Sequence, residues 1–65
     1  MSQPRDVEVK IFMTDAEAMA LAQFMKRVGF SEWRANAVDD DEAYMMRDAC
    51  DRVASALAES GYSPR

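Results

Sequence analysis

Residues 38–61 read VDDDEAYMMRDACDRVASALAESG, and this stretch decides the fold. Apolar residues recur along it at helical spacing: Ala43, Met46, Ala49, Cys50, Val53, Ala56 and Leu57. The pattern predicts an amphipathic helix over about residues 40–59. Asp39 and Glu42 stand three residues apart, as in a capping box, and Gly61 is placed to end the helix.

A second helical pattern lies upstream, between Thr14 and Gly29. Thr14 and Glu17 have the spacing of a capping box, in which each side chain accepts from the other residue's amide. Apolar residues follow at helical spacing: Ala18, Leu21, Ala22, Met25 and Val28. These features predict a helix over about residues 15–28, ended by Gly29 in a left-handed conformation. Ser31 is predicted to cap a short helix over residues 32–37.

Residues 6–13 alternate between polar and apolar side chains, with Val7, Val9 and Ile11 on one side. This period of two predicts a half-buried β-strand. A single strand cannot satisfy its own backbone groups, so we expect it to pair with a second copy or a partner, or to lie across the helices.

The predicted fold class is therefore α+β and mostly helical, with one N-terminal β-strand, two main helices and a short helix between them. The predicted core gathers the large apolar side chains of these elements: Val9, Ile11, Leu21, Phe24, Met25, Val28, Trp33, Met46, Val53 and Leu57.

The chain has 65 residues, which predicts one domain over residues 1–65, with fraying at 1–5 and 62–65. A chain of this length buries only roughly 60% of its unfolded surface, so we expect modest stability or help from a partner. Its one cysteine excludes an internal disulfide. With no signal-peptide pattern and no apolar run of about 18 residues, the sequence predicts a soluble, cytoplasmic protein.

The negative charge is concentrated in one short stretch. Residues 31–42 contain five acids and only Arg34 as a base, and this excess equals the net charge of −4 of the whole chain. A helix cap needs one or two carboxylates, whereas four acids stand in a row here, so the run is either a cap with added solubility or a surface for a basic partner. The predicted partner-binding residues are Asp39, Asp40, Asp41, Glu42, Asp48, Asp51 and Glu32.

Catalytic and cofactor-binding patterns are absent from the sequence. There is no histidine, which removes the usual general base and most zinc sites. Cys50 lies on an apolar stripe, as a core residue does, and two glycines cannot form a phosphate-binding loop. Consecutive acids without a following glycine do not match a calcium-binding loop. We therefore expect no enzyme, no cofactor and no metal site.

The order of strand, capped helix, Gly-Phe-Ser turn at residues 29–31 and further helix resembles the ribbon-helix-helix DNA-binding proteins, over residues 6 to about 37. In that family two strands pair across a dimer and place side chains in the major groove. The resemblance implies a dimeric regulator that associates through residues 6–13. The corresponding outward residues here, Glu8, Lys10 and Phe12, suit DNA poorly.

The chain resembles the anti-CRISPR inhibitors of phages and mobile elements. The resemblance is carried by its small size, its acidity, its lack of catalytic residues and the overall sequence character of residues 14–64. Several of those inhibitors are DNA mimics, with carboxylates where a Cas protein expects phosphates. This resemblance implies an acidic inhibitor in the cytoplasm of a bacterial host cell. It would occupy a basic nucleic-acid-binding surface of a Cas protein, without contacting nucleic acid or membrane itself. The alternatives are the dimeric regulator and a non-catalytic accessory subunit.

Overall fold

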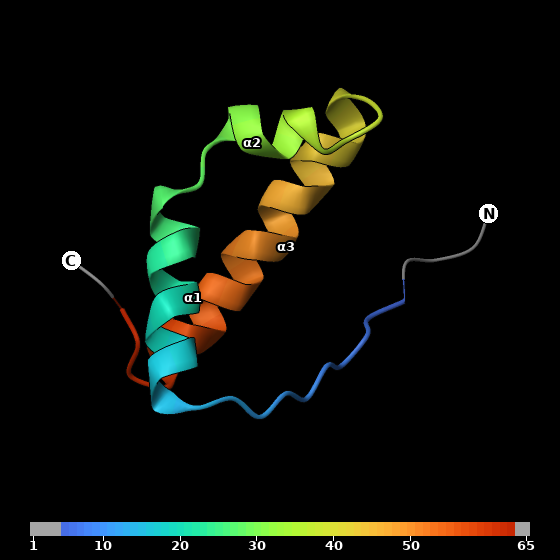
Figure 1. Ribbon diagram of the computed structural model, residues 1–65. Helices are drawn as coiled ribbons and strands as arrows, with labels where there is room; N and C mark the ends of the chain where they lie inside the picture. Colours follow the sequence, from blue (N-terminus) through green and yellow to red (C-terminus); the bar gives the residue numbers. More distant parts are fainter. Residues whose placement is uncertain (1–4, 64–65) are drawn as a thin grey trace.

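The computed structural model describes residues 5–63, which contain three helices and no β-strand (Figure 1). Helix α1 spans Asp15–Arg27, α2 spans Phe30–Ala35 and α3 spans Asp40–Glu59. The predicted α+β class is therefore wrong, whereas the two main helices are confirmed almost to the residue. In Figure 1 the chain runs upwards through α1, crosses the top of the molecule through α2 and returns downwards along α3. Helix α3 packs against both other helices.

The segment predicted as a strand is an extended arm, which we define as residues 5–13. No backbone hydrogen bond within the described chain involves residues 6–13. Figure 1 shows the arm leaving the start of α1 and running away from the helices. The physical reason is that pressing a lone strand onto helices would bury backbone groups without partners, so this backbone lies in water instead.

The helix starts follow the sequence closely. The Thr14 hydroxyl accepts from the Glu17 amide at 3.0 Å, and Glu17 Oε1 accepts from the Thr14 amide at 2.8 Å, which completes the predicted capping box. At α3, Asp39 Oδ1 accepts from the Glu42 amide at 2.9 Å. The reciprocal bond goes one residue further back than predicted, because Glu42 Oε1 accepts from the Val38 amide at 2.9 Å.

The turn between α1 and α2 differs from the prediction. Gly29 has a φ of −121° and is the N-cap of α2, so it does not end α1 in a left-handed conformation. Val28 is the C-cap of α1, in an extended conformation. Helix α2 consequently starts at Phe30, earlier than expected, and the Ser31 hydroxyl donates to Glu32 instead of capping.

Small residues form the buried core. Ala18 and Ala22 of α1 and Ala43 of α3 are the only buried side chains among residues 5–63. The predicted core is wrong for four exposed members: Val9, Ile11, Phe24 and Val53. Its other members are half-buried: Leu21, Met25, Val28, Trp33, Met46 and Leu57. The helices approach through alanines, so the larger side chains lie beside the contact and remain partly in water.

Candidate functional site

The acidic run Asp39–Glu42 forms the start of α3, where three of its four carboxylates have local partners. Asp39 and Glu42 accept the capping bonds described above. Asp40 Oδ1 lies 2.6 Å from Arg34 Nε, in an exposed ion pair that joins the end of α2 to the start of α3. Only Asp41 has no hydrogen-bond or ion-pair partner within the described chain. Much of this run therefore serves the local structure.

The other predicted acids are exposed but separate from this run. Asp48 pairs with its neighbour Arg47 at 3.0 Å. Asp51 is exposed and lies beside a shallow hollow on the outer side of α3. Glu32 accepts from the Ser31 hydroxyl at 2.6 Å, and this bond is the main reason why the pKa of Glu32 is lowered. The structure thus brings Asp39–Glu42 together and places Asp48 and Asp51 two to three turns along the same helix.

An aromatic contact stabilises the corner where these acids lie. The rings of Phe30 and Tyr44 pack with their centroids 5.1 Å apart and their planes tilted by 37°. The guanidinium of Arg47 lies 5.2 Å from the centroid of the Tyr44 ring, which is within the range of a cation–π contact. This contact fixes α2 against the first turns of α3, so the carboxylates of the corner are displayed from a defined surface.

A second candidate surface is the arm, which the sequence predicts to pair with a second copy or a partner, or to lie across the helices. Its apolar side chains are largely exposed: Val7 by 79%, Val9 by 71%, Ile11 by 65% and Phe12 by 91%. Contiguous exposed apolar side chains mark interaction sites far more often than isolated ones do. The alternation of residues 6–13 is the sequence signal for this surface, although the sequence-based prediction also assigns Val9 and Ile11 to the core, where the structure does not place them.

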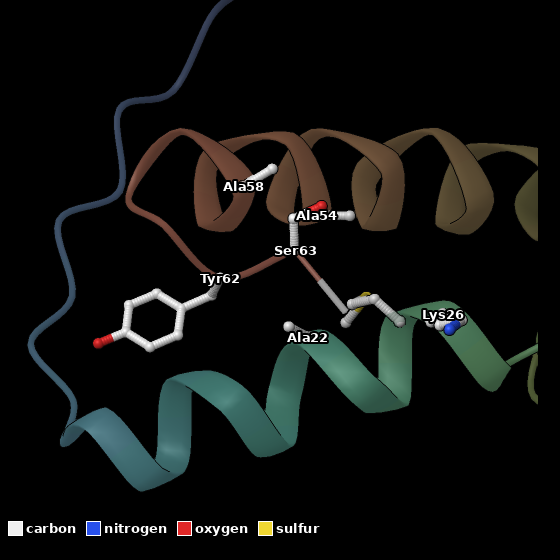
Figure 2. Close-up of a pocket in the computed structure, with 7 residues that line it drawn as sticks. Ala22, Lys26, Ala54, Ala58, Tyr62 and Ser63 are labelled. Atoms are coloured by element: carbon white, nitrogen blue, oxygen red, sulfur yellow. The ribbon is translucent and has the colours of Figure 1, made fainter. Parts of the chain in front are cut away.

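A cavity of about 180 Å³ lies between α1 and the end of α3 (Figure 2). It is lined by Ala22, Met25, Lys26, Ala54, Ala58, Tyr62 and Ser63. In Figure 2, Ala22 of α1 lies opposite the alanines of α3, and Tyr62 points towards the first turn of α1. The cavity is a consequence of the small side chains at the helix contact, and no pair of titratable groups converges in it.

Tyr62 is the polar group of this region with a defined partner. Its hydroxyl donates to a carboxylate oxygen of Asp15, and this bond, with a smaller contribution from desolvation, raises the pKa of Tyr62. Its backbone amide donates to the Leu57 carbonyl at 2.8 Å. Tyr62, which lies just beyond the end of α3, is therefore joined to Asp15, the first residue of α1.

Two further features concern the side chains and helices of residues 5–63. Among residues 5–63 there is no group of three or more His, Cys, Asp or Glu side chains arranged to hold a metal ion. None of the helices there is both long and apolar enough to cross a membrane.

Comparisons with known proteins give one match. No curated protein and no solved structure matches the chain. A model of a family of unknown function, DUF7706, matches residues 1–65. The description of that family names no activity, so the functional inference rests on the surfaces described above. Because the match covers the whole chain, the protein belongs to the DUF7706 family.

Proposed function

We propose that this chain is a small non-catalytic protein-binding protein that acts by stoichiometric association. The observation that supports this proposal is the mismatch between its core and its surface. The buried side chains of residues 5–63 are three alanines, whereas the large apolar side chains of the arm are exposed.

The energetics favour association. Burying one Val or Ile side chain contributes roughly 1.5–3 kcal/mol relative to leaving it in water. The chain alone obtains almost none of this free energy from Val7, Val9 and Ile11, because all three are exposed on the arm. A second protein surface that covered them would supply it, and small domains with limited cores are commonly stabilised in this way.

The test is to purify the tagged chain from the cells in which it naturally occurs and to measure the mass of its complexes by native mass spectrometry. We expect the wild-type chain in a complex of defined stoichiometry. The double variant Val9→Asp/Ile11→Asp should lose that complex, because it places charges in the covered surface. Asp6→Asn, on the polar side of the arm, is the matched control and should retain the complex.

The proposal is overturned if the wild-type chain is only a monomer at its cellular concentration. It is also overturned if the aspartate variant forms the same complexes as the wild type. Far-ultraviolet circular dichroism should show equal helix content in all three proteins, because the arm makes no hydrogen bond to the helices.

A second candidate function follows from the outer face of α3. Asp41, Asp48 and Asp51 are exposed there, which favours electrostatic attraction of a basic, nucleic-acid-handling protein. In this version the chain is an inhibitor whose carboxylates stand in for phosphates, as the resemblance to anti-CRISPR proteins implies. The partner would then be a Cas subunit.

This candidate is tested by changing only acids that do not cap α3. The triple variant Asp41→Asn/Asp48→Asn/Asp51→Asn keeps Asp39 and Glu42, and therefore the helix start. The wild-type chain should reduce the binding of duplex DNA by a purified CRISPR effector complex, and this inhibition should weaken as the salt concentration increases. The triple variant should not inhibit binding. Glu59→Gln is the control. Equal inhibition by the triple variant, or none by the wild type, would remove this candidate.

A further inference from the structure

We propose that the partner of the arm is a second copy of this chain, and that two arms pair antiparallel about a twofold axis at Val9. This inference rests on the proposed function, because it specifies which protein the chain binds. It concerns the contact between two copies, since the fold of a single chain is helical.

The first support is the state of the arm backbone. Residues 6–13 are extended and have no backbone hydrogen bonds within the described chain, so a full row of donors and acceptors is open to a second segment. Such an open edge is a template for pairing. Figure 1 shows that the arm projects away from the helices, so another copy can approach without disturbing them.

The second support is the pattern of side chains along the arm. In an antiparallel pair centred on Val9, Val9 faces its own copy and Val7 faces Ile11, so these three apolar residues all face apolar ones, whereas Phe12 faces Asp6. The same register places Glu8 opposite Lys10, and the symmetry repeats this pair of opposite charges. The arm is thus complementary to itself in both hydrophobicity and charge.

Neighbouring registers are less favourable. Pairing centred on Glu8 brings Glu8 against Glu8, and pairing centred on Lys10 brings Lys10 against Lys10. Pairing centred between two residues places apolar side chains opposite polar ones, because side chains alternate along an extended chain. Pairing centred on Ile11 has no like charges opposite each other, but it leaves Glu8 and Lys10 without a partner of opposite charge. The register centred on Val9 pairs Val7, Val9 and Ile11 among themselves and also places Glu8 opposite Lys10, and this favours a second copy over an unrelated partner.

The dimer would also offer cover to apolar groups outside the arm. Phe24 of α1 is 56% exposed, and Met45 and Val53 of α3 are exposed too. A paired ribbon has one face with six apolar side chains, three from each copy, and needs an apolar surface to cover it. The exposed side chains of the helices provide such a surface within the same dimer.

A cysteine crosslink tests the register. In a Cys50→Ser background, Val9→Cys should form a disulfide-linked dimer under mild oxidation, because directly opposite residues lie about 4.5–5.5 Å apart, within disulfide range. Val7→Cys is the matched control. Its symmetry mate lies four residues away along the ribbon, about 13 Å, so it should not crosslink. Electrophoresis without reductant reads both results.

A charge exchange tests the pairing independently. Glu8→Lys and Lys10→Glu each place like charges opposite each other at two symmetric sites, so each should raise the dimer dissociation constant roughly tenfold. The double variant Glu8→Lys/Lys10→Glu restores both pairs and should return the constant to near the wild-type value. Sedimentation equilibrium measures the constants, and circular dichroism verifies that the helices are unchanged.

The outcomes separate this inference from the proposed function. A wild-type chain that stays monomeric and binds nothing overturns both. The chain could instead form a complex with a different protein, and Val9→Asp/Ile11→Asp could lose that complex while Val9→Cys fails to crosslink. This result supports the proposed function and overturns the inference that the partner is a second copy. Equal crosslinking of Val7→Cys and Val9→Cys, or no rescue by the charge exchange, overturns the pairing about Val9.

Discussion

Tyr62 connects the two ends of the helical part of the molecule. Its backbone amide is bonded to Leu57 of α3, and its hydroxyl donates to the carboxylate of Asp15 at the start of α1. A phenol that donates to a carboxylate loses that bond when it ionises, which is why the pKa of Tyr62 is raised. The stability of the packed pair of helices α1 and α3 should therefore vary with pH in the alkaline range because of this one side chain.

The sign of this dependence follows from linkage. The pKa of Tyr62 is higher in the folded chain than the value of about 10 expected for an unfolded one. The stabilising contribution is therefore fully present below about pH 10 and is lost as the pH rises through the folded pKa. We expect the melting temperature of Tyr62→Phe to fall less than that of the wild type above about pH 10.

Thermal unfolding followed by circular dichroism between pH 8 and pH 11 measures this difference. Tyr44→Phe is the control, because Tyr44 packs against Phe30 and Arg47 at the other end of α3. It should keep the alkaline loss of the wild type. Parallel pH profiles for wild type and Tyr62→Phe would contradict the assigned bond.

Glu17 provides the matching case at acid pH. Its carboxylate accepts a hydrogen bond from the Thr14 amide in the capping box, and this bond is the main cause of the lowered pKa of Glu17. Because the pKa of Glu17 is lower in the folded chain than in the unfolded one, its carboxylate stabilises the folded chain above the unfolded value of about pH 4.3. This contribution is lost as the pH falls through the folded pKa. We expect Glu17→Gln to show a smaller loss of melting temperature below about pH 4.3 than the wild type does.

A shift of the acid-unfolding profile of Glu17→Gln relative to the wild type, measured by circular dichroism between pH 2 and pH 6, tests this expectation. Glu59→Gln, which changes a carboxylate in the last turn of α3, is the control and should follow the wild-type profile. Superimposable profiles for Glu17→Gln and the wild type would contradict a stabilising carboxylate at this cap.

At the scale of the elements, the helix ends are defined by different means. Asp39 and Glu42 supply carboxylate acceptors at the start of α3, whereas its end uses backbone bonds from Ser60, Gly61 and Tyr62. Gly61 has a φ of 101°, in the left-handed region that glycine adopts without cost. The chain needs this conformation to turn Tyr62 back towards α1.

The two glycines should therefore respond differently to the same substitution. Gly61→Ala introduces no contact within 4 Å, but its backbone conformation should destabilise the protein by about 1 kcal/mol. Gly29→Ala has an ordinary φ, and its new Cβ would lie 3.4 Å from the side-chain end of Glu32. We expect a cost below about 0.5 kcal/mol there. Urea unfolding of both variants measures the difference, and equal costs would contradict it.

For the whole molecule, the small alanine core leaves stability dependent on association. If two copies form the folded unit, a hundredfold dilution reduces the free energy of unfolding of the dimer by about 2.7 kcal/mol. The melting temperature of the wild type should therefore fall on dilution. The variant Val9→Asp/Ile11→Asp should melt lower and show no dependence on concentration. A wild-type melting temperature that is constant over this range would contradict the dependence.

The sequence alone determined the two main helices of this protein. Their starts depend on neighbouring residues, as at Thr14 and Glu17, and their lengths depend on a local apolar period, so both could be predicted without tertiary structure. The left-handed conformation of Gly61, at the end predicted for α3, is the same kind of local property.

The tertiary structure alone decided what each apolar side chain contacts. Periodicity shows that Val9 and Ile11 share one side of the arm. Whether that side meets a core depends on a neighbouring segment, and residues 5–63 place none against it. Likewise, the four consecutive acids at Asp39–Glu42 have the same charge pattern whether they cap helix α3 or bind a basic partner. The positions of Arg34 and of the Val38 and Glu42 amides assign three of them to local bonds, because such bonds depend on distances that only the folded chain defines.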